Sequence, residues 1–163
     1  MTDSDEYETT DVVICGCGPT GAMLSAYLGQ MSIKNVVLDR EADITTDPRG
    51  IALDEDGIRF LQGLGIYDGI YTEIGTYLSR KAFLEMDYGT TEGGTGHVGF
   101  ICHKQPVLER YLRDKMAANG FSALRSGCIV THLSESEEWT YCEYTDAEGN
   151  TRRIRSKFFV GAD

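Results

Sequence analysis

A glycine-rich loop between an apolar run and a helix constrains this chain more than any other feature. The predicted strand covers residues 11–15, where Asp11 is followed by four apolar residues, and the loop at 16–21 reads Gly-Cys-Gly-Pro-Thr-Gly. A second apolar run over 36–38 ends at Asp39, 18 residues after Gly21. Strand, loop, helix, strand and terminal acid in this order predict a βαβ unit that binds a dinucleotide.

Each loop residue has a physical role in that prediction. Gly16 makes the tight turn, Gly18 lets the backbone approach a pyrophosphate, and Gly21 lets the helix pack closely on the strands. Pro19 and Thr20 open the helix, where proline loses no hydrogen bond. The free N–H groups and the positive dipole end there face the phosphates.

Asp39 completes the prediction because a carboxylate at this position accepts hydrogen bonds from the ribose of an adenosine. It suits a free 2′-hydroxyl and repels a 2′-phosphate. A second Gly-x-Gly-x-x-Gly match at 94–99 follows polar residues and precedes a strand-like run, so we interpret it as a flexible loop.

Length and charge limit the remaining classes. The 163 residues, 41% of them apolar and 25% charged, predict one soluble domain with an ordinary core. We expect an acidic flexible tail at 1–10 and the domain at 11–163. The acidic start lacks the features of a secretory signal, so a cytoplasmic protein without a membrane segment is expected. The net charge of −11 disfavours nucleic-acid and anionic-membrane partners.

The cysteines and histidines predict neither a disulfide framework nor a metal site. Five cysteines stand at irregular spacing, and two of them, Cys15 and Cys17, fall in the predicted strand and glycine turn. His97, His103 and His132 are interpreted as ordinary surface or turn residues.

Periodicity predicts three helices. The first runs from Pro19 to about Met31, the second covers 54–64, and the third covers 105–119 and stops at Gly120. The large apolar side chains of the first helix are expected to lie on the sheet: Met23, Leu24, Tyr27, Leu28 and Met31.

Strand-like runs cover 77–88 and 99–103, and three more follow the third helix at 128–133, 138–145 and 151–160. The last two are joined by a hairpin signal at 146–150. The predicted fold is therefore α/β: a Rossmann-like βαβ sheet with an inserted antiparallel β ribbon.

Several motifs in this order resemble one family, the flavin-dependent aromatic hydroxylases. The similarity is greatest to the 3-(3-hydroxyphenyl)propionate hydroxylase-like branch of the para-hydroxybenzoate hydroxylase superfamily. The motifs span most of the chain: Gly-Cys-Gly-Pro-Thr-Gly, the Asp39–Arg40 pair, residues 48–59, the Gln-Pro-Val-Leu-Glu run at 105–109, and Phe-Val-Gly-Ala-Asp at 159–163.

The resemblance implies non-covalent FAD in the predicted nucleotide site. The loop would meet the pyrophosphate, and Arg40 would lie on the adenine side, next to Asp39. Arg49 would lie over the pyrophosphate and flavin, where a guanidinium makes paired charge-assisted bonds. Gln105 and Asp163 would contact the ribityl chain.

The implied reaction is hydroxylation of a small phenolic substrate with O2 and NAD(P)H as co-substrates. The flavin supplies the hard chemistry, so no catalytic residue is nominated. The chain stops at Asp163, inside a motif that continues in the family. We therefore expect a FAD-binding portion that is incomplete at its C-terminus and lacks the substrate domain.

Two alternatives stay open. In the first alternative, the chain is a catalytically inactive fragment or a nucleotide-binding interaction module. Such a chain would self-associate through exposed sheet surface. The other alternative is an NAD-dependent dehydrogenase, suggested by Tyr111 and Lys115. Tyr111 falls on the apolar side of its helix and position 98 is Val where that class needs Ser, so the context argues against it.

Overall fold

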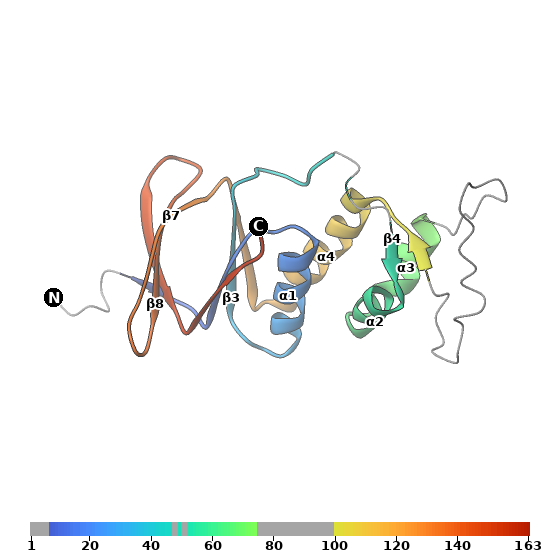
Figure 1. Cartoon of the computed structure of the whole chain (residues 1–163), viewed down its shortest axis with the longest axis horizontal. Coiled ribbons are helices and arrows are strands. Elements are labelled where there is room, and N and C mark those ends of the chain that lie inside the picture. Colours follow the sequence, from blue (N-terminus) through green and yellow to red (C-terminus); the bar gives the residue numbers. More distant parts are fainter. Residues whose placement is uncertain (1–6, 47–48, 50–51, 75–99) are drawn as a thin grey trace. The chain divides into compact units, whose positions relative to one another are not determined.

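The computed structural model describes residues 7–46, 49, 52–74 and 100–163 (Figure 1). The chain divides into two compact units, one made of residues 1–45 and 112–163 and the other of residues 46–111. Both contain helices and strands, which confirms the mixed α/β class.

A four-stranded parallel sheet lies at the centre of the first unit. Its strands are β2 (Val12–Cys15), β3 (Asn35–Asp39), β6 (Ser122–Ser126) and β10 (Phe158–Gly161), in the order β10-β2-β3-β6. Every residue of β3 is buried, as expected for an apolar strand that is covered on both faces.

A second sheet carries the antiparallel strands. Its strands are β1 (Glu8–Thr9), β7 (Ile129–Glu135), β8 (Thr140–Thr145) and β9 (Thr151–Ser156). Strands β7, β8 and β9 form a meander, and β1 adds to β9 in parallel. The predicted hairpin at 146–150 joins β8 to β9, with the Asp146 N–H donating to the Asn150 carbonyl at 2.9 Å.

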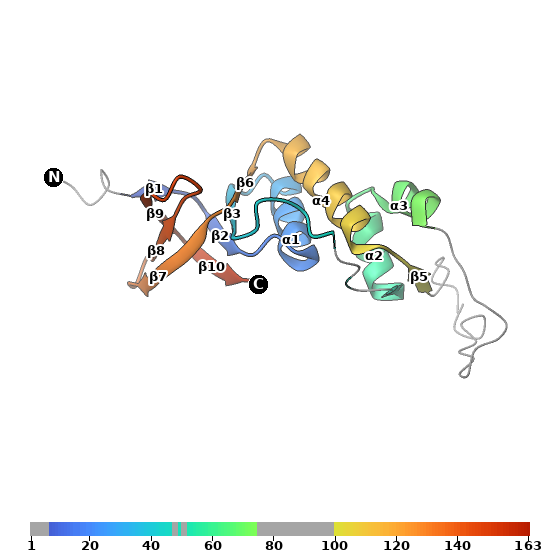
Figure 2. The ribbon, with the colours of Figure 1, turned by 90° about the horizontal axis from the view of Figure 1, so that it is seen from above.

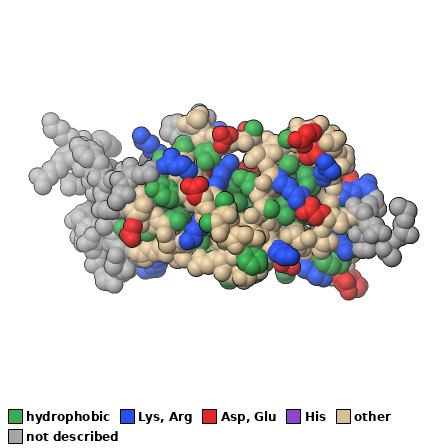
Figure 3. Space-filling view, turned by 180° about the vertical axis from the view of Figure 1, so that it is seen from behind, with side chains coloured by type: hydrophobic (Ala, Val, Ile, Leu, Met, Phe, Trp, Pro, Cys, Tyr) green, Lys and Arg blue, Asp and Glu red, His purple; other side chains and the backbone are tan. Residues whose placement is uncertain are grey.

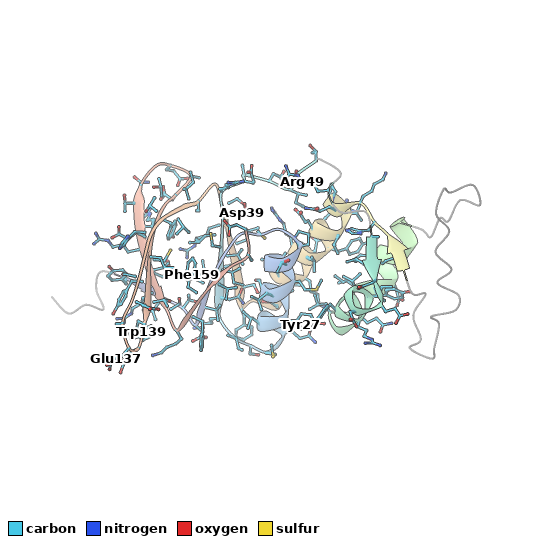
Figure 4. The ribbon with its side chains drawn as sticks, viewed as in Figure 1. Tyr27, Asp39, Arg49, Glu137, Trp139 and Phe159 are labelled. Carbon is cyan, nitrogen blue, oxygen red and sulfur yellow. The ribbon has the colours of Figure 1, made fainter. Side chains whose placement is uncertain are left out.

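The parallel sheet is covered on its two faces by different layers. Helix α1 (Pro19–Gln30) lies on one side of β3, and the meander lies on the other (Figures 1 and 2). The half-buried Phe159 packs between the two sheets (Figure 4). The buried cluster there consists of Val13, Val36, Leu38, Cys128, Cys142, Tyr144 and Ile154.

Helix α1 has nearly its predicted length but buries a different face. Its buried residues are small: Gly21, Ala22, Ser25, Ala26 and Gly29. The large apolar side chains are only half-buried, and Met31, just beyond the helix, is 60% exposed. The predicted stripe is therefore wrong, because close packing against neighbours admits only small side chains. A Cβ on Gly29, for example, would lie 2.2 Å from Nδ2 of Asn119.

The strand predictions need four corrections, one of which is that β4 (Ala52–Asp54) was not predicted. The run 151–160 is two strands, because the chain leaves the meander after Ser156 and enters the parallel sheet as β10. The Lys157 N–H donates to the Asp11 carbonyl at this transfer, at 3.0 Å. The sequence interpretation also missed β6, and it assigned the two residues of β1 to the flexible tail.

The second unit contains β4 (Ala52–Asp54), α2 (Glu55–Gly63), α3 (Tyr67–Ile74) and β5 (Phe100–Cys102). Strands β4 and β5 pair antiparallel. The side chain of Asp54 caps α2 by accepting a hydrogen bond from the Gly57 N–H at 3.0 Å. The sequence did not indicate α3.

Helix α4 (Gln105–Asn119) has the predicted bounds, and its residues fall in both units. The predicted strand at 77–88 and the second glycine match at 94–99 lie outside the described residues. Within the described part of the chain, every helix is too short or too polar to span a bilayer.

Candidate nucleotide-binding site

Three parallel strands end together at one edge of the sheet in the first unit. Cys15 ends β2 and pairs with Gly161 at the end of β10, while Asp39 ends β3 one residue beyond the Leu38–Cys15 pair. The loop from β2 to α1 starts at this edge, and Figure 1 marks the C-terminal residue beside it. Ligands of open α/β sheets bind outside the carboxyl ends of the strands, which is this edge.

Two loop glycines are required by the packing of the protein itself. Gly16 has a φ of +102°, and a Cβ there would lie 2.8 Å from the backbone of Ala162. A Cβ on Gly21 would lie 2.0 Å from the carbonyl oxygen of Gly16. The turn predicted at Gly16 is present, and the close packing predicted at Gly21 is made against residues just beyond the ends of β2 and β10.

Gly18 differs from the other two. Its φ is −68°, which any residue adopts, and no described atom lies within 4 Å of the position a Cβ would take. Internal packing therefore does not explain the absence of a side chain here. The open space in front of Gly18 suits a ligand that approaches the backbone closely, as a pyrophosphate does.

The start of α1 suits an anion. Pro19 occupies the first helical position, and the first helical bond runs from the Ala22 N–H to the Gly18 carbonyl at 2.9 Å. No side chain caps this end and the first turn has no acidic residue. The N–H groups that precede Ala22, including that of the exposed Thr20, lie at the positive end of the helix dipole.

Asp39 connects the loop to the end of β3. It is only 8% exposed, and its Oδ2 accepts from the Cys17 N–H at 2.5 Å while Oδ1 accepts from the Glu41 N–H at 2.8 Å. Sequence reasoning assigned this carboxylate to a ribose and missed its bond to the loop. Each oxygen has a second lone pair, so both functions are compatible.

The thiol of Cys15 lies close to this acidic edge. Burial raises its pKa above the ordinary value, and the carboxylates of Asp163 and Asp39 raise it further. Asp163 is held nearby because the N–H of Ala162 donates to the Cys15 carbonyl at 2.7 Å. The edge therefore favours neutral thiol over thiolate.

Arg40 follows Asp39 but is directed to the surface. Its side chain is 81% exposed and pairs with Glu41 at 3.3 Å. Such surface pairs contribute little to stability, so this guanidinium is available to a ligand at small cost.

Arg49 and Gln105 belong to the second unit. Arg49 is exposed (Figure 4), and Gln105 is half-buried at the start of α4, with its Nε2 donating to Glu109 Oε1 at 2.7 Å. The structure thus brings together the other predicted residues at one sheet edge: Gly16, Gly18, Pro19, Thr20, Gly21, Asp39, Arg40 and Asp163.

A separate cavity of about 420 Å³ lies in the first unit, beside the β8–β9 hairpin. Arg125 extends into its wall, with its Nη2 2.6 Å from Glu8 and its Nη1 bonded to the Tyr144 hydroxyl. None of the predicted site residues lines this cavity. Arg125 is thus paired with groups of the protein itself, and we assign the cavity no ligand.

Comparison with known proteins identifies the family. Residues 9–163 match the FAD binding domain family. The chain belongs to this family. Its glycine loop, helix N-terminus and buried acid fit the pyrophosphate and ribose of FAD.

Curated relatives are hydroxylases of aromatic compounds. The chain is 27% identical over 163 residues to a 3-(3-hydroxy-phenyl)propionate/3-hydroxycinnamic acid hydroxylase of Paraburkholderia xenovorans (strain LB400), covering 97% of this chain and 26% of that protein. It is 28% identical to a probable NADH-specific resorcinol 4-hydroxylase of Rhodococcus jostii (strain RHA1), covering 96% and 31%. It therefore spans about a quarter to a third of these relatives' length.

The fold is shared with solved structures. The p-nitrophenol 4-monooxygenase PnpA of Pseudomonas putida DLL-E4 superposes with a TM-score of 0.87 at 19% identity, over 96% of this chain and 42% of that one. At this identity the likeness concerns the fold alone.

Proposed function

We propose that this chain is the FAD-binding portion of a flavin-dependent monooxygenase that hydroxylates a small phenolic compound with NAD(P)H and O2. The carrying observation is the open space at Gly18, in a loop whose other two glycines are fixed by packing. Open space beside backbone N–H groups at a helix start suits a pyrophosphate. The family match favours FAD over NAD as the dinucleotide that contains this pyrophosphate.

The proposal assigns each residue a part of the cofactor. The loop and the start of α1 hold the pyrophosphate, Asp39 accepts from the adenosine ribose, and Arg40 lies on the adenine side. On the flavin side, Arg49 contacts the pyrophosphate and ring system, while Gln105 and Asp163 bind ribityl hydroxyls. A bound flavin supplies electron transfer from NAD(P)H and activation of O2.

Substrate and reductant are proposed from the relatives' names. A phenolic substrate follows from the 3-hydroxyphenyl and resorcinol hydroxylases, and a nicotinamide reductant follows from the NADH-specific relative. No residue of this chain is proposed to act on the substrate.

Binding is tested by titrating the purified chain with FAD, and in parallel with NAD+. We expect quenching of flavin fluorescence and a rise in melting temperature with FAD, because a ligand of the folded state stabilises it. Stabilisation by NAD+ alone would contradict the proposal.

The reaction is tested by following NADH and NADPH oxidation by the FAD-loaded protein, with resorcinol or 3-(3-hydroxyphenyl)propionate and without a phenol. Oxidation that the phenol stimulates, matched by a hydroxylated product in mass spectrometry, supports the monooxygenase. Binding of FAD without any product leaves the cofactor assignment intact and shows that this chain by itself is a non-catalytic nucleotide-binding module.

A further inference from the structure

Glu109 is a buried acid in the second turn of α4. Its exposure is only 3%, whereas glutamate is almost never fully buried unless it is paired. No ion pair involves Glu109 within residues 7–46, 49, 52–74 and 100–163. Its burial therefore requires another explanation.

The hydrogen bond of Glu109 is to Gln105. The amide Nε2 of Gln105 donates to Oε1 of Glu109 at 2.7 Å. Residues four apart lie on the same helix face, so α4 itself brings the two side chains together. Gln105 is the first residue of this helix and is half-buried.

This contact determines which way the Gln105 amide points. A carboxylate only accepts hydrogen bonds, whereas an amide has a donating nitrogen and an accepting oxygen. Turning the amide over would bring two acceptor oxygens face to face at the same distance. Glu109 therefore holds the nitrogen toward itself and leaves the carbonyl oxygen directed elsewhere.

We propose that Glu109 is a positioning residue that orients the Gln105 amide, so that its carbonyl oxygen accepts a hydrogen bond from a ribityl hydroxyl of FAD. The arrangement selects a hydrogen-bond donor, because the oxygen left available can only accept, and the ribityl hydroxyls are the donors that the proposed cofactor presents to Gln105. The inference rests on the proposed function, since it specifies that Gln105 is the acceptor and FAD the donor in the contact proposed there.

The chain offers a closely matched pair of variants. Glu109→Gln keeps the side-chain length but offers both a donor and an acceptor, so Gln105 is no longer fixed. Asp114→Asn makes the same change of charge at an exposed position of the same helix. We expect Glu109→Gln to weaken FAD binding about tenfold, the effect of roughly one hydrogen bond, and Asp114→Asn to change it less than about twofold.

A double-mutant cycle separates positioning from a general effect on the fold. If Glu109 acts through Gln105, Glu109→Gln has no further effect on the FAD dissociation constant in the Gln105→Ala background. An equal loss of affinity in both backgrounds would show that Glu109 supports only the fold and would overturn the inference.

A second readout does not involve the cofactor. The side-chain amide signal of Gln105 in a 15N NMR spectrum, identified by its loss in Gln105→Ala, should shift in Glu109→Gln and stay in place in Asp114→Asn. An unmoved signal in Glu109→Gln would overturn the inference.

The two proposals fail in different ways. A wild-type chain that binds no FAD contradicts the proposed function and, with it, the inference. If the wild-type chain binds FAD and Glu109→Gln binds it equally tightly, only the inference is contradicted.

Discussion

At the scale of single residues, Gly18 and Gly21 separate ligand binding from folding. An added methyl group at Gly21 meets the Gly16 carbonyl at 2.0 Å, whereas at Gly18 it meets no described atom within 4 Å. We expect Gly21→Ala to lower the free energy of unfolding by about 3 kcal/mol or more, as overpacking does. Gly18→Ala should change it by no more than about 1 kcal/mol, because Ala is only a poorer N-cap.

Of the same two variants, Gly18→Ala should lose FAD affinity while it keeps its stability. Gly18→Ala places a methyl group where the pyrophosphate approaches, so it should weaken FAD binding about tenfold or more in a fully folded chain. Urea unfolding and flavin fluorescence measure the two quantities. Gly18→Ala with unchanged FAD affinity would remove the main support for the site.

The thiol of Cys15 should react slowly at neutral pH. Its pKa is raised by burial and by the carboxylates of Asp163 and Asp39, and only the thiolate is nucleophilic. The rate of alkylation by iodoacetamide, followed by mass spectrometry of the Cys15 peptide, should therefore lie below that of free cysteine at pH 8. It should continue to rise above pH 9.

Removing a nearby charge tests the cause of this shift. Asp163→Asn should speed alkylation of Cys15 at pH 8, whereas Asp114→Asn, a distant exposed change on α4, should not. Equal rates in all three proteins would show that burial alone sets the reactivity.

The turn at Gly16 and the close packing at Gly21 could be predicted from sequence because they follow from a local motif. The bond from the Cys17 N–H to Asp39 could not, because it joins residues 22 apart and depends on the side-chain direction at a strand end. The contact of Glu109 with Gln105 carries a weak sequence signal, since donor and acceptor stand at i and i+4. The burial of Glu109 could not be predicted, because the sequence alone does not show which polar side chains are buried.

At the scale of elements, the buried face of α1 leads to a test of helix packing. Ala26 is 1% exposed, while Met31, one residue past the helix, is 60% exposed. We expect Ala26→Leu to lower the free energy of unfolding by about 1–3 kcal/mol. Met31→Ala should change it by less than about 0.5 kcal/mol. Urea denaturation midpoints would show the opposite order if the large apolar stripe were the buried face.

The β8–β9 hairpin carries a titrating group at its turn. Asp146 accepts from the N–H groups of Glu148 and Asn150 and from Arg152 Nε, the last at 2.7 Å. Chiefly the Arg152 bond lowers the pKa of Asp146 to about 2. Because the folded pKa lies below the ordinary value of 3.8, this stabilisation is present above pH 4 and is lost as the pH falls toward 2.

An NMR titration of the Asp146 carboxyl carbon measures this directly. The midpoint should lie near 2 in the wild-type chain. It should move up toward the ordinary aspartate range in Arg152→Gln, which removes the largest cause. An unchanged midpoint in that variant would assign the shift to the turn backbone instead.

Elements with strong local signals were predicted, and those defined by tertiary pairing were not. Helix α4 has regular periodicity and a Gly stop, so its bounds agree. Strand β6 is a short, largely polar segment that becomes a strand by pairing with β3. The break between β9 and β10 could not be predicted because the residues look strand-like throughout. The change of sheet depends on a distant group, the Asp11 carbonyl, which accepts from the Lys157 N–H.

At the scale of the whole molecule, charge and exposed apolar surface act in opposite directions. The net charge of −11 repels like copies, although acidic and basic side chains are interspersed on the face shown in Figure 3. Phe158, at the start of β10, is 68% exposed. Among the described strands, β10 pairs only with β2, and none of them pairs with its other edge.

An open strand edge beside an exposed aromatic favours association of copies once charge repulsion is screened. We therefore expect the average mass in analytical ultracentrifugation to rise between about 0.02 and 0.5 M NaCl, where the Debye length falls from roughly 20 to 4 Å. Phe158→Lys should abolish the rise, because a charged residue on an edge strand opposes pairing. Phe60→Lys makes the same change at a 54% exposed helical position and should leave the rise intact. Loss of association in both variants would point to general apolar attraction rather than the β10 edge.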